Sequence, residues 1–561
     1  MEAVEPFTET GINHYPRLYY VLLGLLSRLL GTDIVATWQV TGVVVQMLMV
    51  IAISWLLIRL TGQPLLGVFG FVPSLIGTLA VITSGNWYQS LDNHAVLWGA
   101  FGVFFTLNGE SAALSLAVTS TCLIIGVTFP TGQGNVSTER MNWAAIVAAS
   151  ALIGTLANVQ TYSFLTAIYL LVYATSMYGL LSYGSRKHIV ISLICLVVVI
   201  FGGPIIASVC GPLVTLMAGL LAAAPGFSLV LLKHKVRMIG AAAAAALAAS
   251  PTIIGTLAGL ASEDEFLTYR ESSSAALGVP LWPGVLAALA PLIMLALIFW
   301  AGTAQSNKAW QASALGAGVA WALVASNDNW GANQEPYRFW IDSFTIVTAA
   351  TIPILFQVGI RSWSGWRSRV QSDDGARRWR HVNCSASKRG WMVTKHVVLG
   401  SACLTLATSV ALGFADFAKF SAYVQDRGTE SFNDPQARAI GAAVRKGVED
   451  NSAAIRSTEL LLADPCISPF RVKLLTGVPT AFYNLGLAWP EHEKALREVL
   501  KQRTAGTFAR SEAQSGEVGY LLTDSSCSAA WHTEDVGMRV AEVPYSLGGK
   551  VATVTLWKLT A

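Results

Sequence analysis

Charged residues are scarce in this sequence. Only 12% of the 561 residues are Asp, Glu, Lys or Arg, against 53% hydrophobic residues, and the mean hydropathy is +0.53. A soluble globular chain carries about 25% charged residues. The scarcity therefore excludes an ordinary soluble protein and predicts a membrane protein. The net charge of +4 gives no reason to expect nucleic-acid binding.

Motifs for common metals and cofactors are also missing. The sequence contains no nucleophile triad, zinc-ligand spacing, Walker loop or dinucleotide fingerprint. Of the seven cysteines, four lie in apolar runs, where a buried thiol behaves as a small hydrophobe: Cys122, Cys195, Cys210 and Cys403. Cys466 and Cys527 are a candidate disulfide pair if the C-terminal part faces an oxidising compartment.

Long apolar runs are abundant instead. A helix needs about 20 apolar residues to cross roughly 30 Å of hydrocarbon. Runs near that length predict spans at 34–58, 64–83, 111–129, 162–183, 189–208, 211–231, 238–261, 280–300, 309–326, 341–360 and 396–414. Shorter runs at 94–107 and 143–157 are ambiguous. We therefore expect an α-helical polytopic membrane protein with about 11–13 spans over residues 34–414.

Basic residues predict which loops face the cytoplasm. The segment 361–395 carries nine Lys or Arg against two Asp, so we expect it to be cytoplasmic. Counting outward, the bend that begins at Ser326 and everything after Ala415 are then expected to be extracytoplasmic. The loop at 84–93 is outside as well if 94–129 makes one net crossing, which predicts that 94–107 is re-entrant or lies laterally.

Residues 1–33 predict an extracytoplasmic loop with an interfacial amphipathic helix. Its apolar positions form one helical stripe, and Arg28 interrupts a run too short to span; the stripe consists of Leu18, Leu22, Leu25, Leu26 and Leu29. Nothing hydrophobic precedes this helix to carry the N-terminus outward. Either a first span is missing from this chain, or the short tail is translocated unaided.

The composition changes near Ala415, and 415–561 reads as a soluble α/β domain. Asp434-Pro435 is typical of a helix start. Strands are expected at 457–463, 471–477, 518–524 and 550–557, and a helix at 490–503.

Three stretches resemble GT-C membrane glycosyltransferases. YPRLYYVLLGLLSRLLG is similar to the segment where a Tyr-Pro-Pro-Leu-Tyr-Tyr motif opens an amphipathic helix in protein O-mannosyltransferase and aminoarabinose transferase, with Arg17 in place of the second proline. EPYRFWIDSFTIVTAATIPIL resembles the late motif in which an Arg-Tyr or Arg-Phe pair starts a span. SLDNHAVLW resembles a loop of oligosaccharyltransferase catalytic subunits, although their Trp-Trp-Asp signature is absent.

The resemblance implies sugar transfer from a polyprenyl-phosphate donor to a cell-envelope glycan, lipid or protein. The reaction would be an inverting displacement at the outer face of the plasma membrane. Members of this superfamily usually supply an acidic general base from the first extracytoplasmic loop. This chain begins inside that loop.

Arg338 is the first candidate for the donor phosphate, with Tyr337 beside it. A guanidinium offers bidentate donors that bind a lipid phosphate and stabilise it as a leaving group. The alternative is that Arg338 reaches to water or pairs with Glu335. Gln334 and Glu335 are candidate acceptor contacts. Tyr337, Phe339 and Trp340 would stack on sugar or prenyl, or belong to the interfacial aromatic belt.

A second set of candidates is Asp92, Asn93 and His94. These side chains would position an acceptor hydroxyl, or Asp92 would act as general base. Asp92 and His94 are also candidate ligands for a divalent cation such as Mg²⁺ or Mn²⁺. The alternative is that Asp92 caps the helix that follows.

Acids near the N-terminus supply a third set. Glu5 or Glu9 would stand where the superfamily has its base, and His14 and Tyr15 would contact sugar or phosphate from the same loop. The alternative is a solvated tail.

Two other functions remain open. One is a transporter or flippase of lipid-linked sugars, for which ionisable groups near the membrane midplane are expected; the charges recognised in this sequence lie in loops and at span ends. The other is a non-catalytic envelope-assembly protein with a glycan-binding C-terminal domain.

Overall fold

The computed structural model describes residues 16–79, 100–129, 143–261, 279–373, 401–418, 421, 434–450, 460–464, 467–478, 480, 518–527 and 537–559. The chain divides into two compact units, which are described separately. The helical unit comprises Pro16–Ala258 and Ser274–Ser421, and most of the described residues of the other unit lie in Ala422–Ala561.

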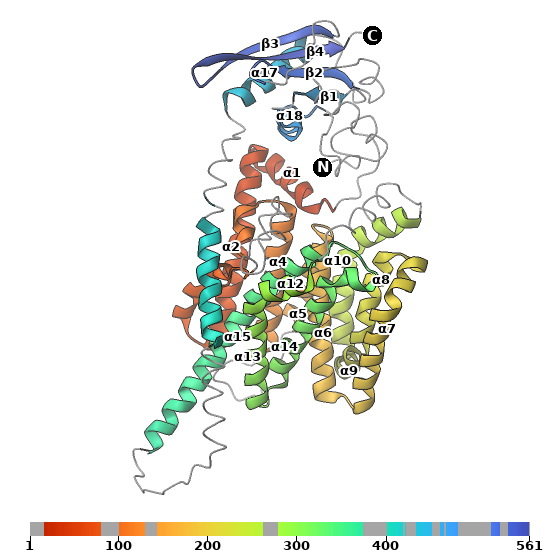
Figure 1. The fold of residues 1–561 in the computed structure, drawn as a ribbon, viewed down its shortest axis with the longest axis vertical. Helices are drawn as coiled ribbons and strands as arrows, with labels where there is room; N and C mark the ends of the chain where they lie inside the picture. Colours follow the sequence, from red (N-terminus) through yellow and green to blue (C-terminus); the bar gives the residue numbers. More distant parts are fainter. Residues whose placement is uncertain are drawn as a thin grey trace. The chain divides into compact units, whose positions relative to one another are not determined.

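Helices make up almost all of the described helical unit (Figure 1). In chain order they are α1 (Leu18–Leu30), α2 (Ile34–Thr61), η1 (Pro64–Leu75), η4 (Ala100–Phe105), α4 (Gly109–Thr128), α5 (Trp143–Leu156), α6 (Thr161–Tyr183), α7 (Arg186–Cys210), α8 (Pro212–Ala218), η5 (Gly219–Ala223), α9 (Ala224–His234), α10 (Val236–Ala261), α12 (Leu281–Ala287), α13 (Leu289–Ala304), α14 (Lys308–Ala325), η7 (Asn327–Trp330), α15 (Pro336–Asp373) and a helix at Ser401–Ala418.

Eight helices in the described residues are long and apolar enough to cross a membrane. A ninth span results if α12 and α13, which meet at a bend of 66°, count as one broken crossing. The expectation of a mostly helical chain is confirmed, and the long apolar helices are compatible with the expected membrane spans. The expected number of 11–13 is not reached among these residues, since α5 has only 14 residues and α14 does not meet the hydropathy criterion.

The span expected at 64–83 does not form a continuous α-helix. Pro64–Leu75 is a 3₁₀-helix, because Pro and Gly recur in it and proline cannot donate an α-helical hydrogen bond. The chain after it is held by hydrogen bonds from Gly77 N to Ser409 O, at 3.1 Å, and from Leu79 N to Ala287 O, at 3.1 Å. Of the ambiguous run 94–107, only the part from Ala100 onward is described, and it forms η4.

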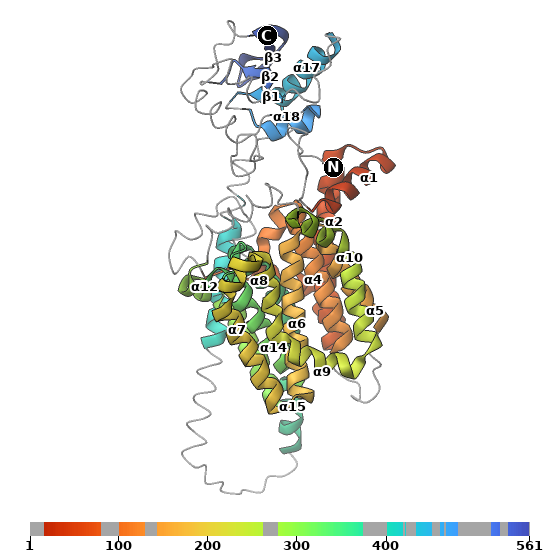
Figure 2. The same ribbon diagram turned by 90° about the vertical axis from the view of Figure 1, so that its right-hand side faces the viewer.

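Helix α6 packs against α14, α9 and α4 (Figure 2). Small residues allow this approach: a Cβ on Gly316 of α14 would lie 2.4 Å from Cα of Ala174 in α6. The terminal helix α1 leaves Leu22, Leu25 and Leu29 exposed, as expected for a helix lying at an interface. The interior of this unit is a single apolar core to which α2, α4, α6, α14 and α15 contribute.

The C-terminal unit holds a four-stranded sheet of order β1-β2-β4-β3. Its strands are β1 (Leu460–Ala463), β2 (Val518–Asp524), β3 (Gly537–Leu547) and β4 (Lys550–Leu559), and only β1 and β2 are parallel. Helix α17 (Pro435–Asp450) packs on β3 and β4. The strands expected at 518–524 and 550–557 are confirmed, and the strand expected at 457–463 is confirmed for its described part, Leu460–Ala463.

One strand prediction in this unit is wrong. Residues 471–477 belong to α18 (Pro469–Thr476), a helix that begins with Pro469 in its first turn and ends at Gly477 with φ 72°. Proline at the first helical position and a left-handed glycine after the last turn favour a helix over a strand here. Strand β3 was not expected, and the helix expected at 490–503 lies outside the described residues.

A buried carboxylate organises the end of β2. Asp524 is 0% exposed and accepts four hydrogen bonds: from Ser526 N and Ser526 Oγ at 2.8 Å each, from Gln436 Nε2 at 2.6 Å and from the Tyr545 hydroxyl at 2.7 Å. The expected N-cap is confirmed, since Ala437 N donates to Asp434 Oδ1 at 2.7 Å. Cys527 is buried with a free thiol, and its proposed partner Cys466 lies outside the described residues.

Candidate functional site

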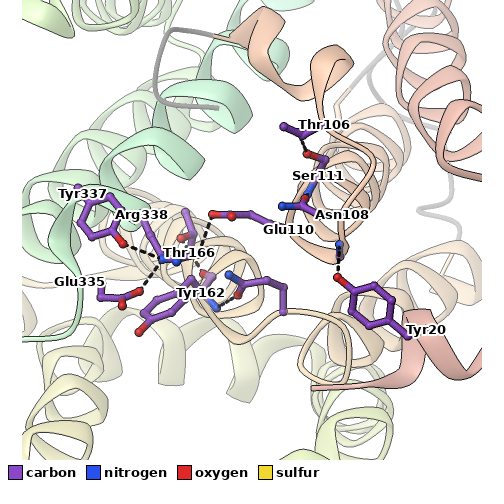
Figure 3. Close-up of polar contacts among 12 residues, drawn as sticks. Tyr20, Thr106, Asn108, Glu110, Ser111, Tyr162, Thr166, Glu335, Tyr337 and Arg338 are labelled. Atoms are coloured by element: carbon purple, nitrogen blue, oxygen red, sulfur yellow. Dashed lines mark hydrogen bonds and ion pairs between the residues drawn. The ribbon is translucent and has the colours of Figure 1, made fainter. Parts of the chain in front are cut away.

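Three helices begin beside one another around Arg338 (Figure 3). Arg338 lies in the first turn of α15, Glu110 in the first turn of α4 and Tyr162 in the first turn of α6. Side-chain caps define two of these starts: Asn108 Oδ1 accepts from Ser111 N at 2.9 Å, and Gln160 Oε1 accepts from Tyr162 N at 2.5 Å. Helix starts carry partial positive charge, so their convergence favours negative groups near Arg338.

Two carboxylates hold the Arg338 guanidinium. Nη1 lies 3.1 Å from Glu110 Oε1, and Nε lies 2.5 Å from Glu335 Oε2. Nε also donates to the Tyr337 hydroxyl at 3.1 Å. The guanidinium carbon lies 5.4 Å from the ring centre of Tyr162, within cation–π range. Arg338 is 16% exposed, and Nη2 donates no hydrogen bond within the part of the chain that the structure describes.

The bend before α15 is built around Asn327, which is fully buried. Its Oδ1 accepts from Gln334 N at 2.6 Å, and its Nδ2 donates to Val324 O and Gln334 O. This bracket fixes the chain just before Glu335, whose φ of 36° is left-handed. A glutamate in that region is strained, since only Gly and a few short polar residues enter it easily. The strained backbone brings the Glu335 carboxylate to Arg338.

The aromatic residues after Arg338 pack inside the protein. Phe339 is 0% exposed and meets Tyr162 edge to face at 5.3 Å, while Trp340 donates to Gly284 O at 3.1 Å and stacks on Phe344. The ring of Trp340 packs with Trp321 of α14 and Phe344 of α15, and the ring of Phe339 packs with Tyr162 of α6. Of the two alternatives for Phe339 and Trp340, stacking on a sugar or prenyl chain would require these buried rings to move.

A third carboxylate lies one helical turn after Arg338. Asp342 is 1% exposed, and within the described residues neither of its oxygens has a hydrogen-bond partner. The Ser163 hydroxyl on α6, which is 0% exposed, also has no partner that meets normal geometry. Glu110 and Arg338 act on Asp342 through their charges, and the Ser163 hydroxyl is its neighbouring hydrogen-bonding group, although the two do not reach normal hydrogen-bond geometry. An unpaired buried carboxylate is costly, and acids inside a span are rare and usually functional.

The helix that follows the N-terminal tyrosine–proline motif is attached to the same region. Gly109 N, at the start of α4, donates to the Tyr20 hydroxyl at 3.2 Å, and Leu18 N donates to Asn158 O at 2.9 Å. Asn158 in turn accepts from Thr252 on α10. These bonds fix α1 beside the residue preceding Glu110.

The structure thus brings together Arg338, Tyr337 and Glu335 of the predicted residues. Gln334 contributes its backbone to the Asn327 bracket. The remaining predicted residues lie outside the described residues: Glu5, Glu9, His14, Tyr15, Asp92, Asn93 and His94. The search of the described residues for three or more His, Cys, Asp or Glu able to hold a metal found none.

Sequence reasoning missed Glu110 and Asp342. Asp342 had a detectable signal, since it is an acid inside an apolar run and four residues after a candidate arginine. Glu110 had a weaker one, a Gly-Glu pair behind a capping asparagine. Comparison with protein-family models finds no match, and no curated protein is similar enough to count as a relative.

Proposed function

We propose that this protein is a membrane glycosyltransferase that transfers a sugar from a polyprenyl-phosphate donor to a cell-envelope glycan, lipid or protein. In this proposal the reaction takes place at the outer face of the plasma membrane. The single observation that carries it is Arg338, an arginine at the start of an apolar helix, held by two carboxylates and with no hydrogen bond from Nη2 to any described residue.

Arg338 suits a lipid phosphate in position and in geometry. A span start lies close to headgroup depth, where the phosphate of a polyprenyl lipid is found. Nη1 and Nη2 form one edge of the guanidinium and match two phosphate oxygens. The three helix starts around it add favourable dipoles for an anion. The resemblance of EPYRFW and YPRLYY to GT-C motifs agrees with this assignment.

The test compares the two arginines of the apolar part of α15. Arg361 lies 23 residues after Arg338, about 35 Å along a regular helix, and its guanidinium packs over Trp310. Membranes holding each variant are incubated with radiolabelled polyprenyl-phosphate hexoses and pentoses, and transfer is counted. We expect Arg338→Ala to lower transfer by about 100-fold or more, because the leaving phosphate loses its cation, and Arg361→Ala to retain it.

Equal rates in the two variants would remove Arg338 from the site. Absence of transfer in the wild-type protein across the whole panel would contradict the proposed function. Arg338→Lys tests the geometry of the group, since lysine keeps the charge and loses the planar fork; we expect an intermediate rate.

Asp342 favours a second candidate, a transporter or flippase of lipid-linked sugars. The charges recognised in the sequence lie in loops and at span ends, and Asp342 departs from that pattern because it is buried in the second turn of an apolar helix. The same assay separates the two functions. A flippase moves the intact labelled lipid across a vesicle membrane and leaves its sugar attached.

A further inference from the structure

An anion that binds the Nη1–Nη2 edge of the Arg338 guanidinium would compete with the Glu110 carboxylate, which contacts Nη1. Glu335 is on the Nε side, and Glu110 is on the Nη1 side. Nη2 is available. A phosphate that binds in bidentate fashion across Nη1 and Nη2 must therefore share or replace the contact of Glu110.

Glu110 is the weaker of the two carboxylate partners. It contacts Arg338 at 3.1 Å from a different helix, while Glu335 contacts it at 2.5 Å from the same chain segment, three residues before it. The Asn327 bracket and the strained backbone hold Glu335 in place. An entering phosphate therefore displaces Glu110 more easily than Glu335.

We propose that the donor phosphate displaces Glu110 from Arg338 and that the freed Glu110 carboxylate is the general base of the transfer. This inference rests on the proposed function and names the base that the sequence did not locate. While Glu110 is paired with Arg338, the cation competes with any proton for its oxygens. Once the phosphate replaces it, Glu110 accepts a proton more readily. The base is then available only when the donor is bound.

The transfer step balances without a further reactant. The acceptor hydroxyl oxygen forms a bond to the anomeric carbon, and its proton passes to Glu110. The bond between the anomeric carbon and the phosphate oxygen breaks, and its electron pair stays on the polyprenyl phosphate, which Arg338 stabilises. The protonated Glu110 loses its proton to water when polyprenyl phosphate leaves and Arg338 becomes available again.

Other charged and titratable groups around Glu110 support proton uptake. Asp342 on α15 interacts electrostatically with Glu110 and with Arg338. The Glu110 charge also interacts with the hydroxyl groups of Tyr20 on α1 and of Tyr337. Tyr162 and Glu335 complete the set through Arg338. Asp342 acts on Glu110 through its charge and is a positioning residue.

The test measures binding before it measures transfer. The full chain in nanodiscs is titrated with a polyprenyl methyl phosphate, which keeps a single negative charge where a phosphomonoester would titrate near pH ~6. If the displaced Glu110 takes up a proton, binding by the wild-type protein weakens as pH rises, by up to about tenfold per pH unit. Glu110→Gln is expected to bind more tightly at high pH and to lose this slope.

Two matched variants sharpen the result. Glu335→Gln removes the other carboxylate of Arg338 and is expected to keep the slope, because Glu110 still has to move. Asp342→Asn is expected to shift the pH-dependent range to lower pH, since the freed Glu110 loses a negative neighbour. Glu110→Gln is also expected to lower transfer by about 100-fold or more while it still binds the probe.

The outcomes separate this inference from the proposed function. A wild-type protein that does not bind the phosphodiester contradicts both. A wild-type protein that binds it without a pH slope, a Glu110→Gln variant that keeps the slope, or one that transfers at the wild-type rate overturns the role of Glu110 alone. Binding by Glu110→Gln also shows that this variant is folded.

Discussion

Asp342 in α15 and Asp524 at the end of β2 are both almost fully buried, at 1% and 0% exposure. Asp524 accepts four hydrogen bonds. Asp342 accepts none with normal geometry among the described residues. The first carboxylate is explained by the fold that it holds together. The second is not, and a buried polar group that the fold does not explain points to function.

The difference follows from the backbone around each residue. Asp524 ends a strand, so the turn after it offers the free N–H of Ser526, and α17 and β3 bring Gln436 and Tyr545 to it. Asp342 lies inside a helix, where each backbone N–H already bonds to the preceding turn. Only side chains can then serve as partners. An acid within a span is therefore left to whatever neighbouring helices, or a bound ligand, provide.

Replacement of Asp524 by Asn gives the largest stability effect that we expect from this comparison. An amide turns one acceptor oxygen into a donor, which then faces either the Gln436 and Tyr545 donors or those of Ser526. The loss of buried hydrogen bonds costs roughly 2–4 kcal/mol. Hydrogen exchange of β2 and β4 in the full chain measures it, with Glu542→Gln, in the exposed Arg539–Glu542 pair, as the control. Unchanged protection would mean that Asp524 does not organise this unit.

The same replacement at Asp342 is expected to act in the opposite direction. Asparagine replaces a buried carboxyl group that has no hydrogen bond of normal geometry among the described residues, so the thermal stability of the detergent-solubilised protein should stay the same or rise, by about 1–3 kcal/mol. Asp342→Asn is nevertheless expected to change phosphate binding, because the pH range over which binding weakens moves to lower pH. A loss of stability as large as that of Asp524→Asn would show that Asp342 has a structural partner, and the contrast between the two aspartates would disappear.

The smallest effect concerns Tyr545, a partner of Asp524. Burial, and after it the hydrogen bond to Asp524, raise the pKa of Tyr545 from its ordinary value near 10 to about 12. A raised tyrosine pKa leaves stability unchanged below pH ~10 and lowers it as pH rises from about 10 through 12. The difference in phenolate absorbance between wild type and Tyr545→Phe should therefore appear near pH 12. A difference that appears near pH 10 would contradict the burial of this hydroxyl.

Apolar runs made most of the helical layout predictable. The predicted spans at 34–58, 111–129, 162–183 and 189–208 coincide with α2, α4, α6 and α7 within a few residues. Each is a continuous apolar run of about the length that a membrane-crossing helix needs. The run at 64–83 failed because mean hydropathy does not register the Pro and Gly spacing that makes Pro64–Leu75 a 3₁₀-helix. In the C-terminal unit, the strand prediction for 471–477 is wrong because Pro469 and Gly477 are the start and stop signals of a helix.

The candidate site was predictable only where it is local in sequence. Arg338, Tyr337 and Glu335 are consecutive or nearly so, and one motif reveals them all. Glu110 meets Arg338 through the packing of α4 on α15, which no local pattern encodes. Asn327 was equally hidden, because its role is to bind the backbone of Gln334. The pairing of Arg338 with Glu335, foreseen as the alternative to ligand binding, is confirmed, and it forms one part of the cluster.

The left-handed backbone of Glu335 sets the stability of the folded protein against the orientation of Arg338. At a φ of 36°, glycine would relax the chain and glutamate strains it. The carboxylate that holds Arg338 is thus maintained against the preference of its own backbone. Laboratory evolution under selection for heat resistance alone should therefore drift toward glycine at this position. The selected variants would have a higher free energy of unfolding and would lack the Glu335 carboxylate that orients Arg338.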